Sequence, residues 1–69
     1  MSNESVFIVF CMESYKAYRN VTGKEVLKLF KENGVFEYLN EFYDVLHTTS
    51  DEYINEDIDK FLRVRNAIL

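Results

Sequence analysis

Residues 21–34 read VTGKEVLKLFKENG, and this stretch carries the clearest structural signal of the chain. Thr22 and Glu25 have the spacing of a capping box, in which the Thr hydroxyl accepts the N–H of the third helical residue. Gly34 ends the predicted helix after Asn33, because Gly adopts the left-handed conformation without strain. The expected buried face of this helix consists of Val26, Leu27, Leu29 and Phe30.

A first helix is predicted over residues 3–19, with Ser2 or Asn3 as its cap, since short polar side chains accept the free N–H groups of a first turn. Residues 6–11 alone would also fit a strand, but the apolar pattern continues to Tyr18 at helical spacing. This helix has two apolar stripes, whereas a surface helix normally has one. The first stripe contains Phe7, Cys11, Tyr15 and Tyr18, and the second contains Val6, Phe10 and Ala17.

Two further helices are predicted after Gly34. One covers residues 35–45, and its expected inward residues are Val35, Phe36, Leu39, Phe42 and Tyr43. The other is capped by Thr49 or Ser50 and frays after Arg65, and its apolar side chains recur at helical spacing at Ile54, Ile58, Phe61 and Leu62. The sequence therefore predicts an all-α fold, a compact bundle of about four short helices.

The composition indicates a single helical domain over residues 1–69. With 48% hydrophobic and 29% charged residues, the chain is too apolar to be disordered and too charged for a membrane protein. The longest apolar run, residues 6–12, is far shorter than a membrane-spanning helix, and the start lacks the positive region of a secretory signal. Cys11 is the only cysteine, so no internal disulfide forms. These features predict a cytoplasmic protein.

Charge is unevenly distributed along the chain, whose net charge is −4. Residues 37–59 contain eight acidic residues and no Lys or Arg, whereas residues 16–31 contain five basic residues and one acid. Two interpretations stay open: solvated faces that partly neutralise each other, or an acidic docking surface for a basic partner. The predicted partner-binding residues are Glu37, Glu41, Asp44, His47, Asp57, Asp59 and, from the second stripe of the first helix, Phe10.

The second stripe of the first helix also bears on partners. Three other helices of a short chain cannot cover both sides of the first one, because small domains bury a small share of their surface. We expect a protein partner or a second copy of the chain, as a homodimer, to cover the stripe around Phe10.

No catalytic, metal or cofactor motif is present in the sequence. His47 is the only histidine, and Asp44 three residues earlier would allow a carboxylate–imidazole contact; the alternative is a His that bonds a backbone carbonyl at a helix end. The acids at 56–59 lack the central Gly and final Glu of a calcium loop, and one His with one Cys makes no zinc site. The sequence predicts a protein that is not an enzyme and has no cofactor.

The two helices around Gly34 resemble a helix-turn-helix in outline. The second of them carries Glu37, Glu41 and Asp44 and no basic residue, so DNA phosphates would repel it. A DNA-binding regulator would instead have to use the basic face of the helix over 23–33, which bears three lysines. Protein contact is therefore the leading hypothesis, and DNA regulation is the alternative.

Five segments carry a family resemblance: Gly23-Lys24-Glu25, Leu29-Phe30, Gly34-Val35 with Tyr38-Leu39, Tyr43-Asp44-Val45-Leu46-His47-Thr48, and Glu56-Asp57-Ile58-Asp59. Together they resemble a small bacterial family catalogued as domain of unknown function 3791. The resemblance covers the chain from about Val6 to Phe61, and its most specific parts are Leu46-His47-Thr48 and Asp57-Ile58-Asp59. It implies no established activity. Members of the family are often encoded beside proteins that resemble ADP-ribosyltransferases, which implies a small partner or antitoxin-like role.

Overall fold

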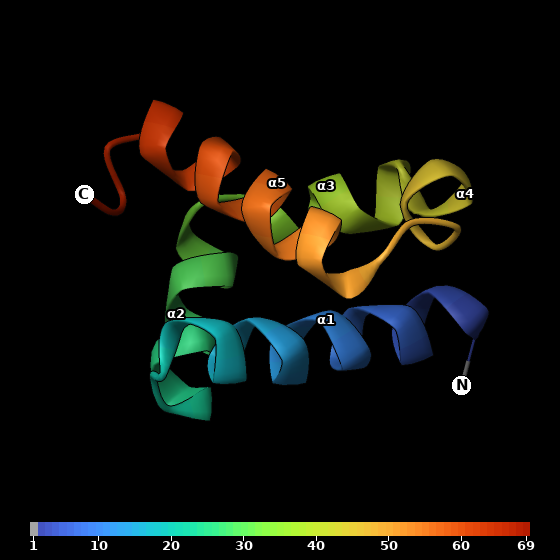
Figure 1. Cartoon of the computed structure of the whole chain (residues 1–69), viewed down its shortest axis with the longest axis horizontal. Coiled ribbons are helices and arrows are strands. Elements are labelled where there is room, and N and C mark those ends of the chain that lie inside the picture. The colour runs from blue at the N-terminus through green and yellow to red at the C-terminus, as the bar shows by residue number, and fades with distance from the viewer. Residues whose placement is uncertain (1) are drawn as a thin grey trace.

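The computed structural model describes residues 2–69, and these form helices and no strand, which confirms the all-α class (Figure 1). The helices are α1 (Asn3–Arg19), α2 (Gly23–Glu32), α3 (Val35–Glu41), α4 (Tyr43–Leu46) and α5 (Asp51–Val64). The long helices α1 and α5 lie side by side, α2 closes one end of this pair, and α4 lies at the opposite end. Because α1 contacts α2, α3 and α5, it is the central helix of the bundle.

Side-chain caps begin the three longer helices, as the sequence predicts. Ser2, Thr22 and Ser50 each accept the N–H of the residue three positions later, at 3.1 Å. In residues 2–69 the backbone N–H of Thr22 donates no hydrogen bond to the Glu25 carboxylate. Only one of the two hydrogen bonds of a capping box therefore forms. Gly34 separates α2 from α3 with a φ of 74°, the left-handed conformation expected there.

The helix predicted over 35–45 is interrupted at Phe42, whose φ of −101° and ψ of 20° separate α3 from α4. The interruption turns Tyr43 toward α1, where its ring meets Phe7 edge to face at a centroid distance of 5.3 Å. Phe42, predicted to face inward, is 44% exposed and packs only against Tyr38 among the aromatic rings, at 5.2 Å. The prediction of one uninterrupted helix over 35–45 was wrong, because the aromatic contact between α1 and α4 offsets the energetic cost of the irregular turn.

The core lies where α1, α2, α3 and α5 meet. Phe30 is its centre, with ring centroids 5.4 Å from Tyr15 and 5.7 Å from Phe36. Leu27 was expected in the core and is instead 49% exposed, because it lies on the lysine side of α2. The buried apolar residues are Cys11, Tyr15, Val26, Phe30, Val35, Leu39, Leu46, Ile54, Ile58 and Leu62.

The chain folds back on itself after α5. Asn66 takes a φ of 58°, and the N–H of Ala67 donates to the carbonyl of Leu62 at 2.9 Å. Ala67 and Ile68 then pack against the core. The helix therefore ends one residue before the fraying point predicted at Arg65, with a packed segment after it. Throughout residues 2–69, the helices fall short of the length and apolarity that crossing a membrane requires.

Candidate interaction surface

Asp59, a predicted partner-binding residue, is buried inside the bundle. Its carboxylate is 3% exposed and accepts a hydrogen bond from the hydroxyl of Tyr15 at 2.6 Å. The guanidinium groups of Arg19 and Arg63 lie 3.6 and 3.7 Å from its other oxygen. Burial, and then the hydrogen bond and charge of Asp59, raise the pKa of Tyr15 above its usual value. Asp59 ties α5 to α1, so the prediction that it belongs to an exposed docking surface was wrong.

Asp57 accepts a similar tyrosine hydrogen bond on the other side of α5. It is half-buried and accepts a hydrogen bond from the hydroxyl of Tyr38 on α3. Burial, and then this hydrogen bond, raise the pKa of Tyr38 to about 12. Residues two apart point to opposite sides of a helix, so α5 binds α3 through Asp57 and α1 through Asp59, with Ile58 in the core between them. The Asp57-Ile58-Asp59 segment therefore has a structural explanation.

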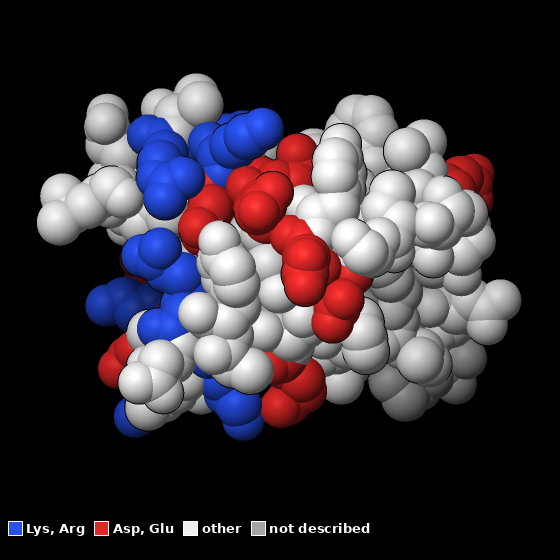
Figure 2. Space-filling model, viewed as in Figure 1, with Lys and Arg blue, Asp and Glu red and all other residues white. Residues whose placement is uncertain are grey.

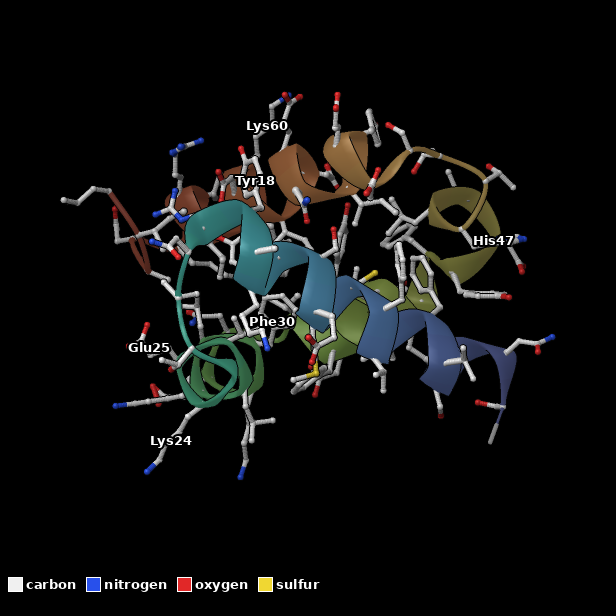
Figure 3. The ribbon with its side chains drawn as sticks, turned by 60° about the horizontal axis from the view of Figure 1, so that its bottom comes forward. Tyr18, Lys24, Glu25, Phe30, His47 and Lys60 are labelled. Carbon is white, nitrogen blue, oxygen red and sulfur yellow. The ribbon has the colours of Figure 1, made fainter. Side chains whose placement is uncertain are left out.

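His47 lies just after α4, at the end of the molecule away from Lys24 (Figure 3). Its Nδ1 is 2.7 Å from the carbonyl oxygen of Tyr43, and the two rings stack at 4.4 Å. No ion pair joins it to Asp44 in residues 2–69, so the carboxylate–imidazole contact that the spacing would allow does not form. The backbone-bonded alternative is the one that the structure shows. Thr48 also donates to a carbonyl of α4, at 2.8 Å.

The exposed acids of residues 37–59 are distributed over two regions. Glu37, Glu41 and Asp44 are exposed on α3 and α4, as predicted. A second group, Asp51, Glu52 and Glu56, is exposed along α5. Figure 2 shows acidic side chains in a band across the middle of one face and basic side chains gathered at the end formed by α2 and the ends of α1 and α5. The charge asymmetry of the sequence is thus also an asymmetry in space.

A shallow groove runs between α1 and α5. From α1 it is lined by Phe10, which is 53% exposed, and by Tyr18, which is 47% exposed. The floor is polar: the amide of buried Asn55 donates to the hydroxyl of Ser14 at 3.1 Å. The remaining lining residues are Glu13, Ala17 and Asp51. The second apolar stripe of α1 therefore remains uncovered in the single chain, with Phe10 at its centre, as the sequence indicates.

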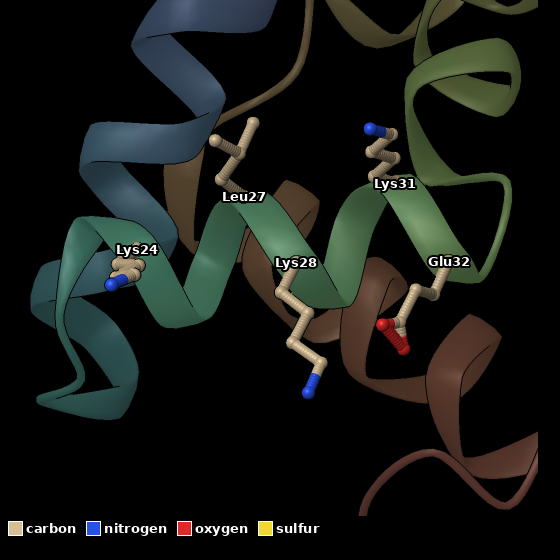
Figure 4. A pocket seen from close by; sticks show the side chains of 5 residues that line it. All are labelled: Lys24, Leu27, Lys28, Lys31 and Glu32. Atoms are coloured by element: carbon tan, nitrogen blue, oxygen red, sulfur yellow. The ribbon is translucent and has the colours of Figure 1, made fainter.

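The outer face of α2 forms a second, basic surface (Figure 4). Lys24, Lys28 and Lys31 surround the exposed side chain of Leu27, and Glu32 completes the lining of a shallow pocket. These side chains project from one side of a single helix, and Lys24 points away from the bundle (Figure 3).

Neither surface assembles the groups of a recognisable reaction. In residues 2–69 no group of His, Cys, Asp or Glu is placed to hold a metal ion. Cys11 is buried, and burial raises the pKa of its thiol to about 12, which makes it a poor nucleophile.

The model of the family described as Protein of unknown function (DUF3791) matches residues 6–65. The chain belongs to this family. No curated protein and no solved structure matches it significantly. The match runs from the first turns of α1 to the residue after α5. Both tyrosine–aspartate pairs and the α1–α5 groove of this DUF3791 protein lie inside the matched region.

Sequence reasoning found Phe10 but missed the other residues around it. Ser14 and Asn55 are far apart in the chain, and Tyr18, which belongs with Tyr15 to the first stripe, is about half exposed. The available signal was Ser14, a polar residue one helical turn after Phe10 in the otherwise apolar second stripe. It indicates that this side of α1 meets water or another polar group.

Proposed function

We propose that this protein is a protein-interaction module that acts by contact, as the neutralising partner of a toxin-like enzyme encoded beside it. The observation that carries the proposal is the outer stripe of α1. Val6 and Phe10 are both more than half exposed on the central helix, whose opposite side already fills the core. Contiguous exposed apolar residues are typical of protein-binding surfaces, whereas isolated ones are ordinary. The antitoxin-like role follows from the family resemblance and from the acidic and apolar character of this face.

Co-expression with the product of the adjacent gene tests the proposal. We expect a complex that co-purifies and that elutes ahead of the free chain by size exclusion. Phe10→Ser should weaken this complex and restore the toxicity of the neighbour, whereas Phe42→Ser is the matched control, since Phe42 is similarly exposed but outside the groove. A monomer that binds no neighbour, or a complex indifferent to Phe10→Ser, would overturn the proposed role of this face.

A second candidate function is a DNA-binding regulator that uses α2. The observation in its favour is the set of three exposed lysines on one side of this helix (Figure 4). A gel shift at low salt with the DNA upstream of its own gene would detect it, and replacing the three lysines with Gln should abolish the shift. The absence of a shift at low salt removes this function.

A further inference from the structure

The groove between α1 and α5 has an apolar side and an acidic side. Phe10 and Tyr18 supply exposed rings from α1, and Asp51 lines the groove at the start of α5. Glu56 follows on the exposed surface of α5. The pKa of the Tyr18 hydroxyl is raised by burial and by Asp59, and then by the negative charge of Glu56. The band of acids in Figure 2 lies along this face.

Few cations offset this negative charge. Lys16 is near the groove, but its ammonium group lies 3.1 Å from the carboxylate of Glu13, so the pair contributes almost no net charge. Helix α5 carries no Lys or Arg before Lys60. Arg19, the other cation near Tyr18, lies 3.6 Å from the carboxylate of Asp59. Asp51 in the lining and Glu56 near Tyr18 therefore leave the α5 side of the groove negatively charged.

The polar floor of the groove is already satisfied. Asn55 and Ser14 bond to each other, and in residues 2–69 no buried side-chain nitrogen or oxygen lacks a hydrogen-bond partner. A small polar ligand would need convergent groups with free hydrogen-bonding capacity, as in most ligand sites. The groove offers rings and methyl groups along α1 instead, which suit an apolar ridge of another macromolecule.

We propose that this groove binds a basic amphipathic helix of the partner protein; the inference rests on the function proposed above. The stripe from Val6 to Ala17 spans three helical turns, roughly 16 Å, which is the length over which a docked helix presents successive apolar anchors. The Lys and Arg residues of the docked helix face Asp51 and Glu56 on the α5 side. Complementary charge of this kind speeds association and fixes the orientation of the bound helix.

The chain itself contains a helix of similar chemistry, α2, in which lysines surround the exposed Leu27. Docking of α2 from a second copy would join two different surfaces and leave one of each free, so copies would assemble into rings or open chains. Light scattering over a range of concentrations distinguishes self-association from the binding of a partner helix. We expect a monomer, and growth in mass that Lys28→Glu prevents would overturn the proposal in favour of self-association.

A displayed library of helical peptides of about 14 residues, selected against the full chain, tests the chemistry of the occupant. We expect the enriched peptides to carry Lys or Arg along one side and apolar residues at helical spacing on the other. Fluorescence anisotropy with the enriched peptides should show affinity at least tenfold weaker for Phe10→Ala, as is usual for a central aromatic anchor.

Charge variants test the position of the acids. Asp51→Asn with Glu56→Gln should weaken binding of an enriched peptide at least about fivefold. Glu25→Gln with Glu32→Gln changes the net charge equally on α2, outside the groove, and should change the dissociation constant less than about twofold. Circular dichroism checks that each variant is folded. If Phe10→Ala is not, Phe10→Leu takes its place and should weaken binding at least threefold.

Three further outcomes overturn the proposal: enriched peptides without positive charge, no enrichment above background, or equal weakening by the two charge pairs. The two proposals fail separately. A complex with the neighbouring gene product that tolerates the α5 charge variants and resists competition by the enriched peptides excludes a basic helix as the occupant. Basic peptides that need Phe10, in the absence of any neighbour complex, support the groove and count against the antitoxin-like role.

Discussion

The two sides of α1 carry similar residues in different surroundings. Tyr15 and Tyr18 show the difference most directly, since they are three residues apart and Asp59 raises the pKa of both hydroxyl groups. Tyr15 is fully buried and donates to the carboxylate, whereas Tyr18 is about half exposed at the edge of the groove. Residue type alone therefore does not separate a side chain that stabilises the fold from one available for contact. The neighbouring helices that cover each ring decide it.

Replacing each tyrosine with Ala gives the largest expected effect on this comparison. Tyr15→Ala removes a buried ring and the hydrogen bond to Asp59, so the free energy of unfolding should fall by about 3–5 kcal/mol. Tyr18→Ala removes an exposed ring and should cost less than about 1 kcal/mol. Urea unfolding followed by circular dichroism measures both. Equal costs for the two variants would abolish the distinction between the inner and outer sides.

Removing single hydroxyl groups sharpens the comparison within the core. Tyr15→Phe leaves the buried carboxylate of Asp59 without its closest donor, which should cost about 1–3 kcal/mol. Tyr38→Phe should cost less, under about 1 kcal/mol, because Asp57 is half-buried and water replaces the lost donor. Thermal unfolding of both variants gives the order, and a larger loss for Tyr38→Phe would contradict it.

Alkaline pH acts on the inner side of α1 through two groups that keep their protons in the folded chain. Burial raises the pKa of the Cys11 thiol from 9.0 to about 12, and burial and then Asp59 raise the pKa of Tyr15 above 10.0. The unfolded chain releases these protons at lower pH than the folded chain does. The free energy of unfolding should therefore fall as pH rises above about 9, by at most about 1.4 kcal/mol per pH unit for each proton.

Urea unfolding between about pH 8 and pH 10.5 measures this slope. The control is the double variant Cys11→Ala with Tyr15→Phe, which removes both groups from the titration. It should be less stable at neutral pH and should show a flatter decline at alkaline pH. A decline as steep as that of the unchanged chain would mean that neither group is responsible.

Local sequence signals were sufficient for the helices but not for their contacts. The caps at Thr22 and Ser50 and the stop at Gly34 depend on neighbouring residues, so they could be predicted. The bond between Tyr15 and Asp59 joins residues 44 positions apart, and nothing near Asp59 marks it as buried. The negative charge of Asp59 therefore predicted a position on the surface.

The candidate site was predictable to the extent that it depends on one helix. The two apolar stripes of α1 exceed what a small bundle can bury, and this indicated that Phe10 would be exposed. Which residues of α5 lie beside it depends on how the two helices pack, so Asn55 and Asp51 were not assigned to the groove. The interruption at Phe42 likewise depends on the contact of Tyr43 with Phe7, which is remote in sequence.

Phe10→Ser has the smallest expected effect on the fold and completes the comparison from the outer side. The ring is about half in water already, so its loss should change the free energy of unfolding by less than about 0.5 kcal/mol. Its helical neighbour Cys11 is buried, and Cys11→Ser should cost more, because it places a hydroxyl in the core. Urea unfolding of the two variants compares adjacent residues of one helix, one exposed and one buried. If Phe10→Ser were as costly as Cys11→Ser, the outer stripe would be part of the core rather than a surface left for a partner.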